Sequence, residues 1–510
     1  MAPSQYDVDF IVIGGGSGGM AAAKEAAKNG AKVALFDYVK PSTQGTQWGL
    51  GGTCVNVGCV PKKIMHYAGL QAINMHDAQA LGWQVEADSI KHDWTTLVET
   101  VQNHVGSLNW GYKLGLRSNK VNYINATAAF IDAHTVTYTL KGVEKTLSAA
   151  NLLIAVGGRP VIPESIPGAL EHAITSDDIF SLYTSPGRTL CVGASYISLE
   201  CGGFLKELGY EVDVAMRSIP LRGFDRQCSE KVADLMDKLG VTFHKQYVPS
   251  LIKKTSSGDL EVTMTHTVTN EEIVKSYNTV MFATGRRADT DGLNLAAAGL
   301  SALPNGKLAT DYADVTSVSH IYAIGDCAQE RPELTPVAVQ AGQYLARRVF
   351  GGSSKNMDYK MVATAVFTPF EYGAVGYSEE DALTTFGEDA IEVYLFEFTT
   401  LEAGAVHRKK HPSRIADEYD ADFGDTCLAK LVCLKNENER VVGFHFIGPN
   451  AGEITQGYAL ALKAGVTKAM FDDTVGIHPT DAESFHALEI TRRSGKSWVA
   501  EGGCGGGVCG

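Results

Sequence analysis

Short apolar runs alternate along the chain with segments rich in helix-forming residues, a pattern typical of α/β proteins. The first apolar run, residues 10–13, predicts a strand over residues 9–13, and the Ala-, Lys- and Glu-rich residues 20–29 predict a helix. A second strand is expected over residues 31–36. Strand, helix and strand in this order predict a βαβ unit with a right-handed crossover.

A second unit with the same order begins near residue 188. Residues 189–192 predict a strand, residues 196–208 a helix, and residues 211–216 the next strand. In both units a short turn of small residues joins the first strand to the helix, as in folds that bind dinucleotides. The chain is therefore predicted to carry two dinucleotide-binding units in series, and with them two nucleotide cofactors.

The remaining segments have patterns of their own. Residues 152–160 and 279–287 share a strand that runs into a Gly turn, and each is expected to end a nucleotide domain. From about residue 364, β-rich runs such as 427–434 and 441–447 predict an antiparallel sheet with helices. Beyond Trp498 the chain is Gly-rich, and we expect it to be mobile rather than packed.

Length and charge limit the classes of protein that fit. The chain has 510 residues and a net charge of −14, from 44 basic and 58 acidic residues. The acidic balance argues against nucleic acid or an anionic membrane surface as a partner. No apolar stretch reaches the ~18 residues of a spanning helix, and the first apolar run is too short for a signal peptide. We therefore expect a cytoplasmic protein of about two to four domains.

The first Gly cluster has the form G-x-G-x-x-G, with Gly14, Gly16 and Gly19. Glycines at these positions allow a tight turn, close approach of backbone to a pyrophosphate and close helix–strand packing. Asp37, at the end of the second strand, is placed to accept hydrogen bonds from a ribose diol. A Gly-rich turn without a ligand is the alternative, but the flanking strand, helix and acid favour a nucleotide site.

The second turn departs from this pattern, because small residues replace two of its glycines after Gly193. No acidic residue ends its second strand. Arg217 stands there instead, with Arg222 close by. A 2′-phosphate needs cations and is repelled by a carboxylate, so NADP is favoured over NAD. The alternative is a solvated basic loop.

A pair of cysteines, Cys54 and Cys59, is the most specific chemical motif. Four residues separate them at a predicted loop-to-helix boundary, a spacing that can form a disulfide across one helical turn. A helix N-terminus lowers the pKa of a thiol, and Lys62 brings a positive charge to the same region. A zinc pair is the rival, but zinc motifs usually show C-x2-C spacing and further ligands. Six other cysteines occur singly and are expected to be buried and inert: Cys191, Cys201, Cys228, Cys327, Cys427 and Cys433.

Two further groups stand near the C-terminus. His478 and Glu483 form a His-Pro-x-x-x-Glu grouping, in which the imidazole could exchange protons near neutral pH and the carboxylate could orient it. A structural histidine is the alternative. Cys504 and Cys509 repeat the C-x4-C spacing between glycines, which favours reach and access over packing. An accidental or metal-binding tail is the alternative for this second pair.

These motifs resemble the pyridine nucleotide–disulfide oxidoreductases, the glutathione reductase-like flavoenzymes, over essentially the whole chain. Within them the sequence is similar to the large thioredoxin reductases, through residues 217–225 and the cysteine tail. The tail is similar to that of the apicomplexan branch. The resemblance implies an α/β fold with two Rossmann-like dinucleotide-binding domains, for FAD and NADPH, and an α+β C-terminal dimerisation domain.

The resemblance also implies the domain boundaries. Residues 1–160 and 289–360 would form the FAD domain, residues 161–288 the NADPH domain, and residues 361–498 the dimer interface. Residues 499–510 would form a flexible redox-active tail. The protein would be a homodimer whose active sites are shared between subunits.

Carried over by residue, the resemblance makes Cys54 the interchange thiol and Cys59 the charge-transfer thiol, with Lys62 paired to Glu200 beside the flavin. Tyr196 would cover the nicotinamide pocket. The residues implied for FAD are Gly14, Gly16, Ser17, Gly18, Asp37, Thr53, Lys62, Ala128, Gly157, Asp326 and Thr335. The residues implied for NADPH are Gly193, Tyr196, Ile197, Glu200, Arg217, Arg222, Gly285 and Arg286.

The implied reaction passes electrons from NADPH through FAD and Cys54–Cys59 to Cys504–Cys509 of the partner subunit, and then to thioredoxin. His478 and Glu483 would handle the protons at the other subunit's cysteine pair. Two alternatives remain. A glutathione reductase needs no tail, and Lys24 stands where those enzymes carry an Arg for the glutathione carboxylate. A flavoprotein whose tail binds soft metal ions is the other.

Overall fold

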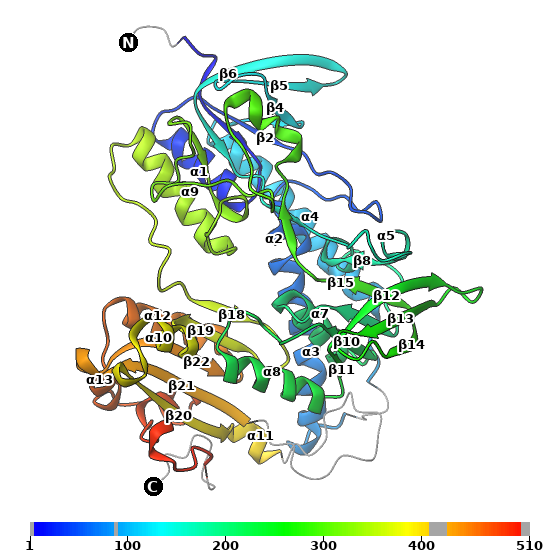
Figure 1. Cartoon of the computed structure of the whole chain (residues 1–510), viewed down its shortest axis with the longest axis vertical. Helices are drawn as coiled ribbons and strands as arrows, with labels where there is room; N and C mark the ends of the chain where they lie inside the picture. The colour runs from blue at the N-terminus through cyan, green and yellow to red at the C-terminus, as the bar shows by residue number, and fades with distance from the viewer. Residues whose placement is uncertain (1–4, 86–89, 407–425, 501–510) are drawn as a thin grey trace.

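The computed structural model describes residues 5–85, 90–406 and 426–500. Figure 1 shows an α/β protein with three sheet-based units, and the predicted fold class is confirmed. The first unit lies at the top of the view, the second at the lower right and the third at the lower left. No helix within the described segments has both the length and the apolar character needed to cross a membrane.

A seven-stranded sheet forms the first unit. Its strands are β3 (Asn122–Asn125), β2 (Val33–Asp37), β1 (Val8–Ile13), β6 (Val143–Ile154), β5 (Thr135–Leu140) and β4 (Ala128–Phe130), with β17 (Ile321–Ala323) beside β6. β1 pairs in parallel with β2 and β6, so Ile13 lies between Phe36 and Ile154. Helix α1 (Ser17–Lys28) packs against α9 (Thr335–Phe350) next to this sheet.

Helix α1 begins three residues earlier than the sequence pattern predicts, since the glycines of the turn form its first turn. A Cβ at Gly19 would lie 1.9 Å from the carbonyl oxygen of Gly14. The absence of a side chain at Gly19 therefore lets the helix pack directly on the end of β1.

A parallel sheet of five strands forms the second unit. Its strands are β11 (Thr242–Lys245), β10 (Val212–Met216), β9 (Thr189–Val192), β15 (Thr279–Phe282) and β8 (Ile174–Thr175). Helices α7 (Tyr196–Glu207) and α8 (Arg226–Lys238) belong to this unit. An antiparallel sheet adjoins it, made of β12 (Tyr247–Lys254), β13 (Leu260–His266) and β14 (Glu272–Tyr277). The second predicted strand–helix–strand unit is confirmed.

A two-stranded ladder marks where the chain passes between the first two units. β7 (Gly158–Pro160) pairs antiparallel with β16 (Arg286–Ala288). β7 follows the long strand β6 of the first unit, and β16 follows β15 of the second. At residues 152–160 the chain therefore leaves the first unit for the second, and at residues 279–287 it leaves the second unit again. The two crossings lie side by side.

The third unit is an antiparallel sheet covered by helices, as predicted. Its strands are β18 (Thr364–Val366), β19 (Tyr372–Gly376), β22 (Arg440–Ile447), β21 (Thr426–Leu434) and β20 (Ile391–Thr399). Its α-helices are α10 (Glu379–Phe386), α11 (Leu401–Ala405), α12 (Ala451–Lys463) and α13 (Lys468–Asp472).

Helices α2 (Gly52–Val57), α3 (Cys59–Ala80) and α4 (Trp94–Ser118) connect the units. One apolar core joins Met65 of α3, Phe204 of α7 and Leu395 of β20. Helix α3 is therefore fixed against both lower units. The remaining short helices are α5 (Ala169–His172), α6 (Ser176–Ile179), η2 (Asp291–Leu293), η3 (Leu295–Ala298), η4 (Gly325–Cys327), η5 (Glu388–Ala390), η6 (Lys435–Glu437), η7 (Asp481–His486) and η8 (Arg492–Ser494).

The C-terminal segment differs from the expectation that packing ends at Trp498. Val499 forms a bridge with Glu397 of β20, and the N–H of Ala500 donates to the carbonyl of Glu397 at 2.8 Å. Both residues therefore extend the sheet edge rather than begin a tail. Cys504 and Cys509 lie outside the described residues.

Candidate active site

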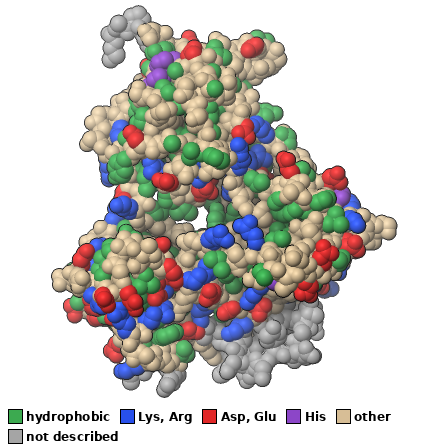
Figure 2. Space-filling model, in the orientation of Figure 1, with side chains coloured by type: hydrophobic (Ala, Val, Ile, Leu, Met, Phe, Trp, Pro, Cys, Tyr) green, Lys and Arg blue, Asp and Glu red, His purple; other side chains and the backbone are tan. Residues whose placement is uncertain are grey.

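One cavity of about 1630 Å³ lies where the three units meet. Figure 2 shows the hollow in the middle of this face, with Lys and Arg side chains on its rim. Sixteen of the predicted site residues line the cavity: Gly14, Gly16, Ser17, Gly18, Asp37, Thr53, Cys54, Cys59, Lys62, Gly157, Tyr196, Ile197, Glu200, Arg286, Asp326 and Thr335. Residues far apart in the sequence thus share one space.

The other predicted residues within the described segments lie outside the cavity lining. Ala128 is in β4, 4% exposed and packed in the core of the first unit, so its side chain has no access to a ligand there. Arg217 and Arg222 are exposed on the loop after β10. Gly193 and Gly285 occupy turns with positive φ, at +104° and +142°. His478 and Glu483 belong to the third unit.

The first nucleotide turn is held by the strand beside it. The N–H of Gly14 donates to the carbonyl of Phe36 at 2.8 Å, and the N–H of Gly15 donates to Asp37 Oδ1 at 2.9 Å. Burial raises the pKa of Asp37, against the effect of the hydrogen bond from Gly15. A Cβ at Gly14 would lie 2.2 Å from the carbonyl oxygen of Ala155, so only glycine fits this turn.

The cysteine pair lies at the junction of two helices. Cys54 is in α2, and Cys59 is the first residue of α3. Both are thiols whose side chains hydrogen-bond to each other. The Sγ of Cys59 lies 3.8 Å from Thr335 Oγ1, at the start of α9. The thiols therefore lie at the N-terminal end of the helix that carries Lys62, where Cys59 faces α9.

The surroundings of the two thiols shift their pKa values in opposite directions. The hydrogen bond from Cys54 lowers the pKa of Cys59, burial opposes this, and Thr335 and the charge of Lys62 help to bring it to about 6. The same hydrogen bond, together with burial, raises the pKa of Cys54 well above the usual range for a thiol. Cys59 is thus the thiolate of the pair near neutral pH, and Cys54 keeps its proton.

An amide network fixes the loop that carries Cys54. Asn56 Nδ2 donates to the carbonyls of Gly49 and Gly52, at 3.2 and 2.8 Å. Asn109 of α4 donates to Asn56 Oδ1 at 2.9 Å and to the carbonyl of Leu50 at 2.7 Å. No local pattern marks Asn109, since it lies fifty or more residues from the cysteines.

The predicted pair of Lys62 and Glu200 is present. Lys62 Nζ lies 2.7 Å from Glu200 Oε1, and both side chains are nearly buried. The N–H of Phe367 donates to the same oxygen at 2.8 Å, and its ring lies 4.1 Å from Lys62 Nζ. Sequence reasoning missed Phe367, which no local motif marks.

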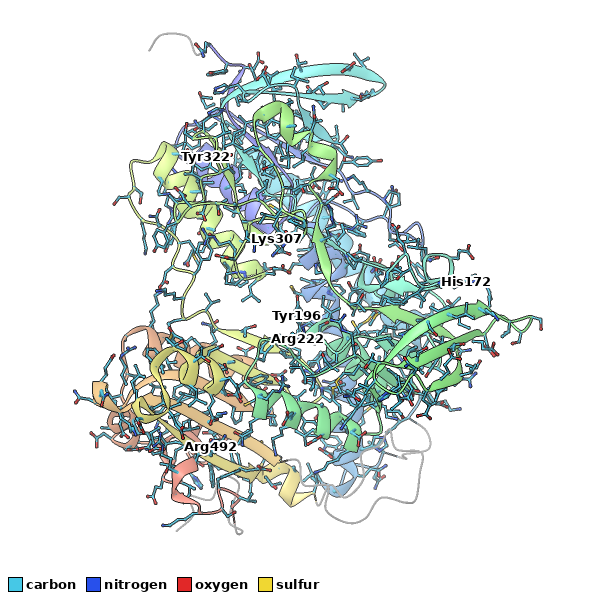
Figure 3. The ribbon with its side chains drawn as sticks, in the orientation of Figure 1. His172, Tyr196, Arg222, Lys307, Tyr322 and Arg492 are labelled. Carbon is cyan, nitrogen blue, oxygen red and sulfur yellow. The ribbon has the colours of Figure 1, made fainter. Side chains whose placement is uncertain are left out.

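The second nucleotide turn opens α7. Ser198 Oγ donates to the carbonyl of Gly193 at 2.6 Å, and the N–H of Leu221 donates to the carbonyl of Ala194 at 2.9 Å. The second bond ties the turn to the loop of Arg217 and Arg222. Figure 3 shows Tyr196 and Arg222 near each other on the cavity side of this unit.

Arg286 of β16 lines the cavity. It donates to the carbonyl of Gly158 and, at 3.5 Å, to Thr53 Oγ1, next to Cys54. The carboxyl of Asp326 in η4 lines the same space, and burial raises its pKa. A guanidinium and a carboxyl group are therefore available to the polar parts of a ligand.

His478 and Glu483 contact each other as predicted, but away from this cavity. His478 Nδ1 lies 3.0 Å from Glu483 Oε1, with the imidazole half exposed and the carboxylate buried. The N–H of Thr480 also donates to Glu483 Oε1 at 3.4 Å. Glu483 therefore orients the ring through Nδ1.

The six single cysteines are buried, as predicted. A second cavity, of about 460 Å³, lies between α12, α13 and η7. No predicted site residue lines it. The chemistry expected from the sequence is therefore concentrated in the larger cavity.

Comparisons with known proteins agree with this site. Residues 8–342 match the family described as pyridine nucleotide-disulphide oxidoreductase, and residues 362–488 match its dimerisation domain. A thioredoxin reductase of Plasmodium falciparum (isolate FCH-5) is 55% identical over 510 residues, which cover 99% of this chain and 93% of that protein. The thioredoxin reductase of isolate 3D7 is also 55% identical, with coverage of 99% and 81%.

A third relative comes from another organism. Thioredoxin reductase SEP1 of Emiliania huxleyi is 51% identical over 516 residues, which cover 99% of this chain and all of that protein. The predicted resemblance is confirmed by these matches. The first nucleotide turn, the start of the second nucleotide-binding helix and a pair of contacting thiols line one cavity and fit the same assignment, and the chain is an oxidoreductase that belongs to the pyridine nucleotide-disulphide oxidoreductase family.

Proposed function

We propose that the protein is a thioredoxin-disulfide reductase that uses FAD and NADPH. The net reaction converts NADPH, a proton and oxidised thioredoxin into NADP⁺ and thioredoxin dithiol. The observation that carries the proposal is the contact of Cys54 with Cys59 on a cavity that is also lined by the first nucleotide turn and by the start of α7. The names of the three relatives support thioredoxin as the substrate.

The first turn fits a flavin dinucleotide. A Cβ at Gly16 would meet only the Cα of Gly52, 3.7 Å away, so space is open above the start of α1. No side chain of the described residues caps that helix, and its N–H groups suit a pyrophosphate. FAD bound here would supply the two-electron carrier between NADPH and the cysteines. Its proposed contacts are Gly14, Gly16, Ser17, Gly18, Asp37, Thr53, Lys62, Gly157, Asp326 and Thr335.

The second turn and its basic loop suit NADPH. The two exposed guanidinium groups of Arg217 and Arg222 follow β10, where an acidic residue would favour NAD instead. Tyr196, 38% exposed at the first position of α7, would cover the nicotinamide pocket. Ile197, Glu200, Gly193, Gly285 and Arg286 complete the proposed set.

The two thiols would have different roles because their pKa values differ. Cys59 would face the flavin as the thiolate, with Lys62 and Thr335 holding its negative charge. Cys54, whose pKa is raised, must lose its proton before it attacks a disulfide. An imidazole held by a carboxylate can take that proton and return it. We assign this role to His478 of the partner subunit, oriented by Glu483.

The proposed relay continues through the C-terminal cysteines. Cys54 would attack the Cys504–Cys509 disulfide of the partner subunit, and the reduced pair would reduce thioredoxin by thiol–disulfide exchange. The active homodimer would have the domain boundaries expected above, except that the tail begins after Ala500. A cytoplasmic location remains a prediction from the sequence.

Removal of residues 501–510 tests the proposal. The truncated protein keeps every contact described here, so NADPH should still reduce its flavin under anaerobic conditions. Its thioredoxin reduction should fall to background, because the inner thiols lie inside the cavity. Full thioredoxin activity in the truncated protein would contradict the proposed relay.

Two other outcomes would identify a rival function. Reduction of glutathione disulfide at a rate equal to or above that of thioredoxin, unchanged by the truncation, would favour a glutathione reductase. Stoichiometric tight binding of Cu(I) or Zn(II) by the full chain, lost on truncation and without disulfide reduction, would favour a metal-binding tail.

A further inference from the structure

Lys430 of β21 is a fully buried cation between two units of the protein. Its side chain is 0% exposed. The Nζ lies 2.9 and 2.7 Å from the two carboxylate oxygens of Asp225 and 2.7 Å from Glu379 Oε2. A buried ammonium group is costly unless its partners are fixed around it. None of the proposed catalytic steps uses these three residues.

Asp225 gives this cluster its link to the nucleotide site. It is the last residue of the loop 217–225 and the N-cap of α8, where its Oδ1 accepts the N–H of Cys228 at 3.1 Å. Its Oδ2 also accepts the N–H of Glu379 at 3.0 Å. Lys430 and Glu379 of the third unit therefore bind the end of the loop that carries Arg217 and Arg222.

The same loop is held at its middle by the nucleotide turn. Leu221 has a φ of +43° and donates its N–H to the carbonyl of Ala194. Arg226 donates to the carbonyl of Pro220 at 2.8 Å. Arg222 lies between these anchors and Asp225, while Arg217 directly follows β10. The position of Arg222 thus depends on both ends of a short segment.

We infer that Lys430 is a positioning residue for recognition of the 2′-phosphate of the nucleotide, through its grip on Asp225. This inference rests on the proposed binding of NADPH at Arg217 and Arg222. Two guanidinium groups hold a phosphate well only when their spacing is fixed. Release of Asp225 would leave Arg222 held only by its hydrogen bond to Ser218 Oγ and by the bond of Leu221 to Ala194, with the Ala194 turn and Tyr196 in place. The effect should therefore fall on the 2′-phosphate and spare the rest of the nucleotide.

A second ion pair on the same helix provides a matched control. Lys231 of α8 lies 2.5 Å from Glu397 Oε1 of β20, so it also joins the second unit to the third. It lies beyond the first turn of α8 and six residues after the loop ends. Loss of this pair would weaken the same interface without releasing Asp225. Figure 3 shows Arg222 on the second unit and Arg492, which contacts Glu379, on the third.

The experiment compares Lys430→Met with Lys231→Met in the flavin-loaded full-length protein. Calorimetry would measure binding of adenosine 2′,5′-bisphosphate and of AMP, and steady-state assays would give KM and kcat with NADPH and NADH. For Lys430→Met we expect about tenfold weaker binding of the bisphosphate and a similar rise in the KM for NADPH, which is the effect of losing one fixed charge-assisted contact. AMP binding, the KM for NADH and kcat should stay unchanged, and Lys231→Met should match the wild type in all of them.

A second variant tests the inference if Lys430→Met does not fold. The double variant Lys430→Met with Asp225→Asn removes both charges, so no unpaired carboxylate of Asp225 stays buried. Its preference for the bisphosphate over AMP should fall as much as in Lys430→Met. Wild-type preference in either folded variant, or the same loss in Lys231→Met, would overturn the inference. The double variant Arg217→Ala with Arg222→Ala distinguishes failure of the proposed NADPH site from failure of the proposed role of Lys430. If it too keeps wild-type preference, the proposed NADPH site is wrong; if it loses preference while Lys430→Met does not, only the role of Lys430 is wrong.

Discussion

Lys62 of α3 and Glu200 of α7 form a nearly buried ion pair with 2.7 Å between Nζ and Oε1. The same carboxylate oxygen accepts the N–H of Phe367, which lies between β18 and β19 of the third unit. One oxygen atom therefore joins the helix of the redox cysteines, the nucleotide-binding helix and the third unit. This arrangement holds the ammonium group within electrostatic range of Cys59.

Substitution of Lys62→Met should raise the pKa of Cys59. Removal of a positive charge near a thiolate favours the neutral thiol, and we expect a rise of about one unit from the value of about 6. The pH dependence of alkylation of Cys59 in the reduced enzyme, followed by peptide mass spectrometry, measures it. Lys63→Met is the matched control, because Lys63 Nζ lies 3.9 Å from the ring of Phe367 and pairs with Glu371 instead. An unchanged alkylation profile in Lys62→Met would contradict the electrostatic role.

Gly16 and Gly19 should respond differently to alanine. At Gly19 the new Cβ would lie 1.9 Å from the backbone oxygen of Gly14, so the variant should lose about 1–3 kcal/mol of stability even without flavin. At Gly16 the Cβ would enter open space, so the apoprotein should keep its stability and bind less flavin. Thermal unfolding of the apoproteins and flavin absorbance per chain separate the two effects. Full flavin content in Gly16→Ala would argue against a pyrophosphate at this turn.

The stability of the protein should fall as pH rises from about 6.5 to 9, because of His66. This imidazole is fully buried, 3.1 Å from Glu371 Oε1 and 3.6 Å from Glu207 Oε2. Burial alone would lower the pKa of His66, but the two carboxylates outweigh it and raise the pKa to about 8. The folded state therefore binds a proton that the unfolded state releases above its own pKa. The resulting stabilisation, about 2 kcal/mol, is complete below pH 6.5 and is lost as pH passes through 8.

Urea denaturation at a series of pH values measures this effect. His66→Gln should be less stable than the wild type at pH 6 and should show a flatter profile between pH 6.5 and 9. His104→Gln, at an exposed position of α4, serves as the control and should follow the wild type. A wild-type slope in His66→Gln would assign the proton uptake to another group.

The sequence was sufficient for the features that lie within one local segment. The first Gly turn, the Cys54–Cys59 segment and the strand–helix–strand order of both nucleotide units each follow from neighbouring residues. Contacts across the chain left no such signal: Phe367 and Glu371 lie about three hundred residues from Lys62 and His66. Asp225 and Lys430 are likewise joined only by the topology of two units. The sequence pattern places Val499 and Ala500 in the tail, which is wrong. Their pairing with Glu397 joins segments far apart in the chain and leaves no pattern among neighbouring residues.

The location of His478 outside the cavity of its own chain predicts an active site shared between subunits. A heterodimer of one Cys54→Ser chain and one His478→Gln chain contains one site that has lost both groups and one site that has lost neither. Purified with two different affinity tags, it should retain about half of the wild-type thioredoxin reduction, although each parent homodimer is nearly inactive. A wild-type chain paired with a chain that carries both substitutions should be inactive, because each of its sites lacks one group. If each site were built within one chain, the two results would be reversed.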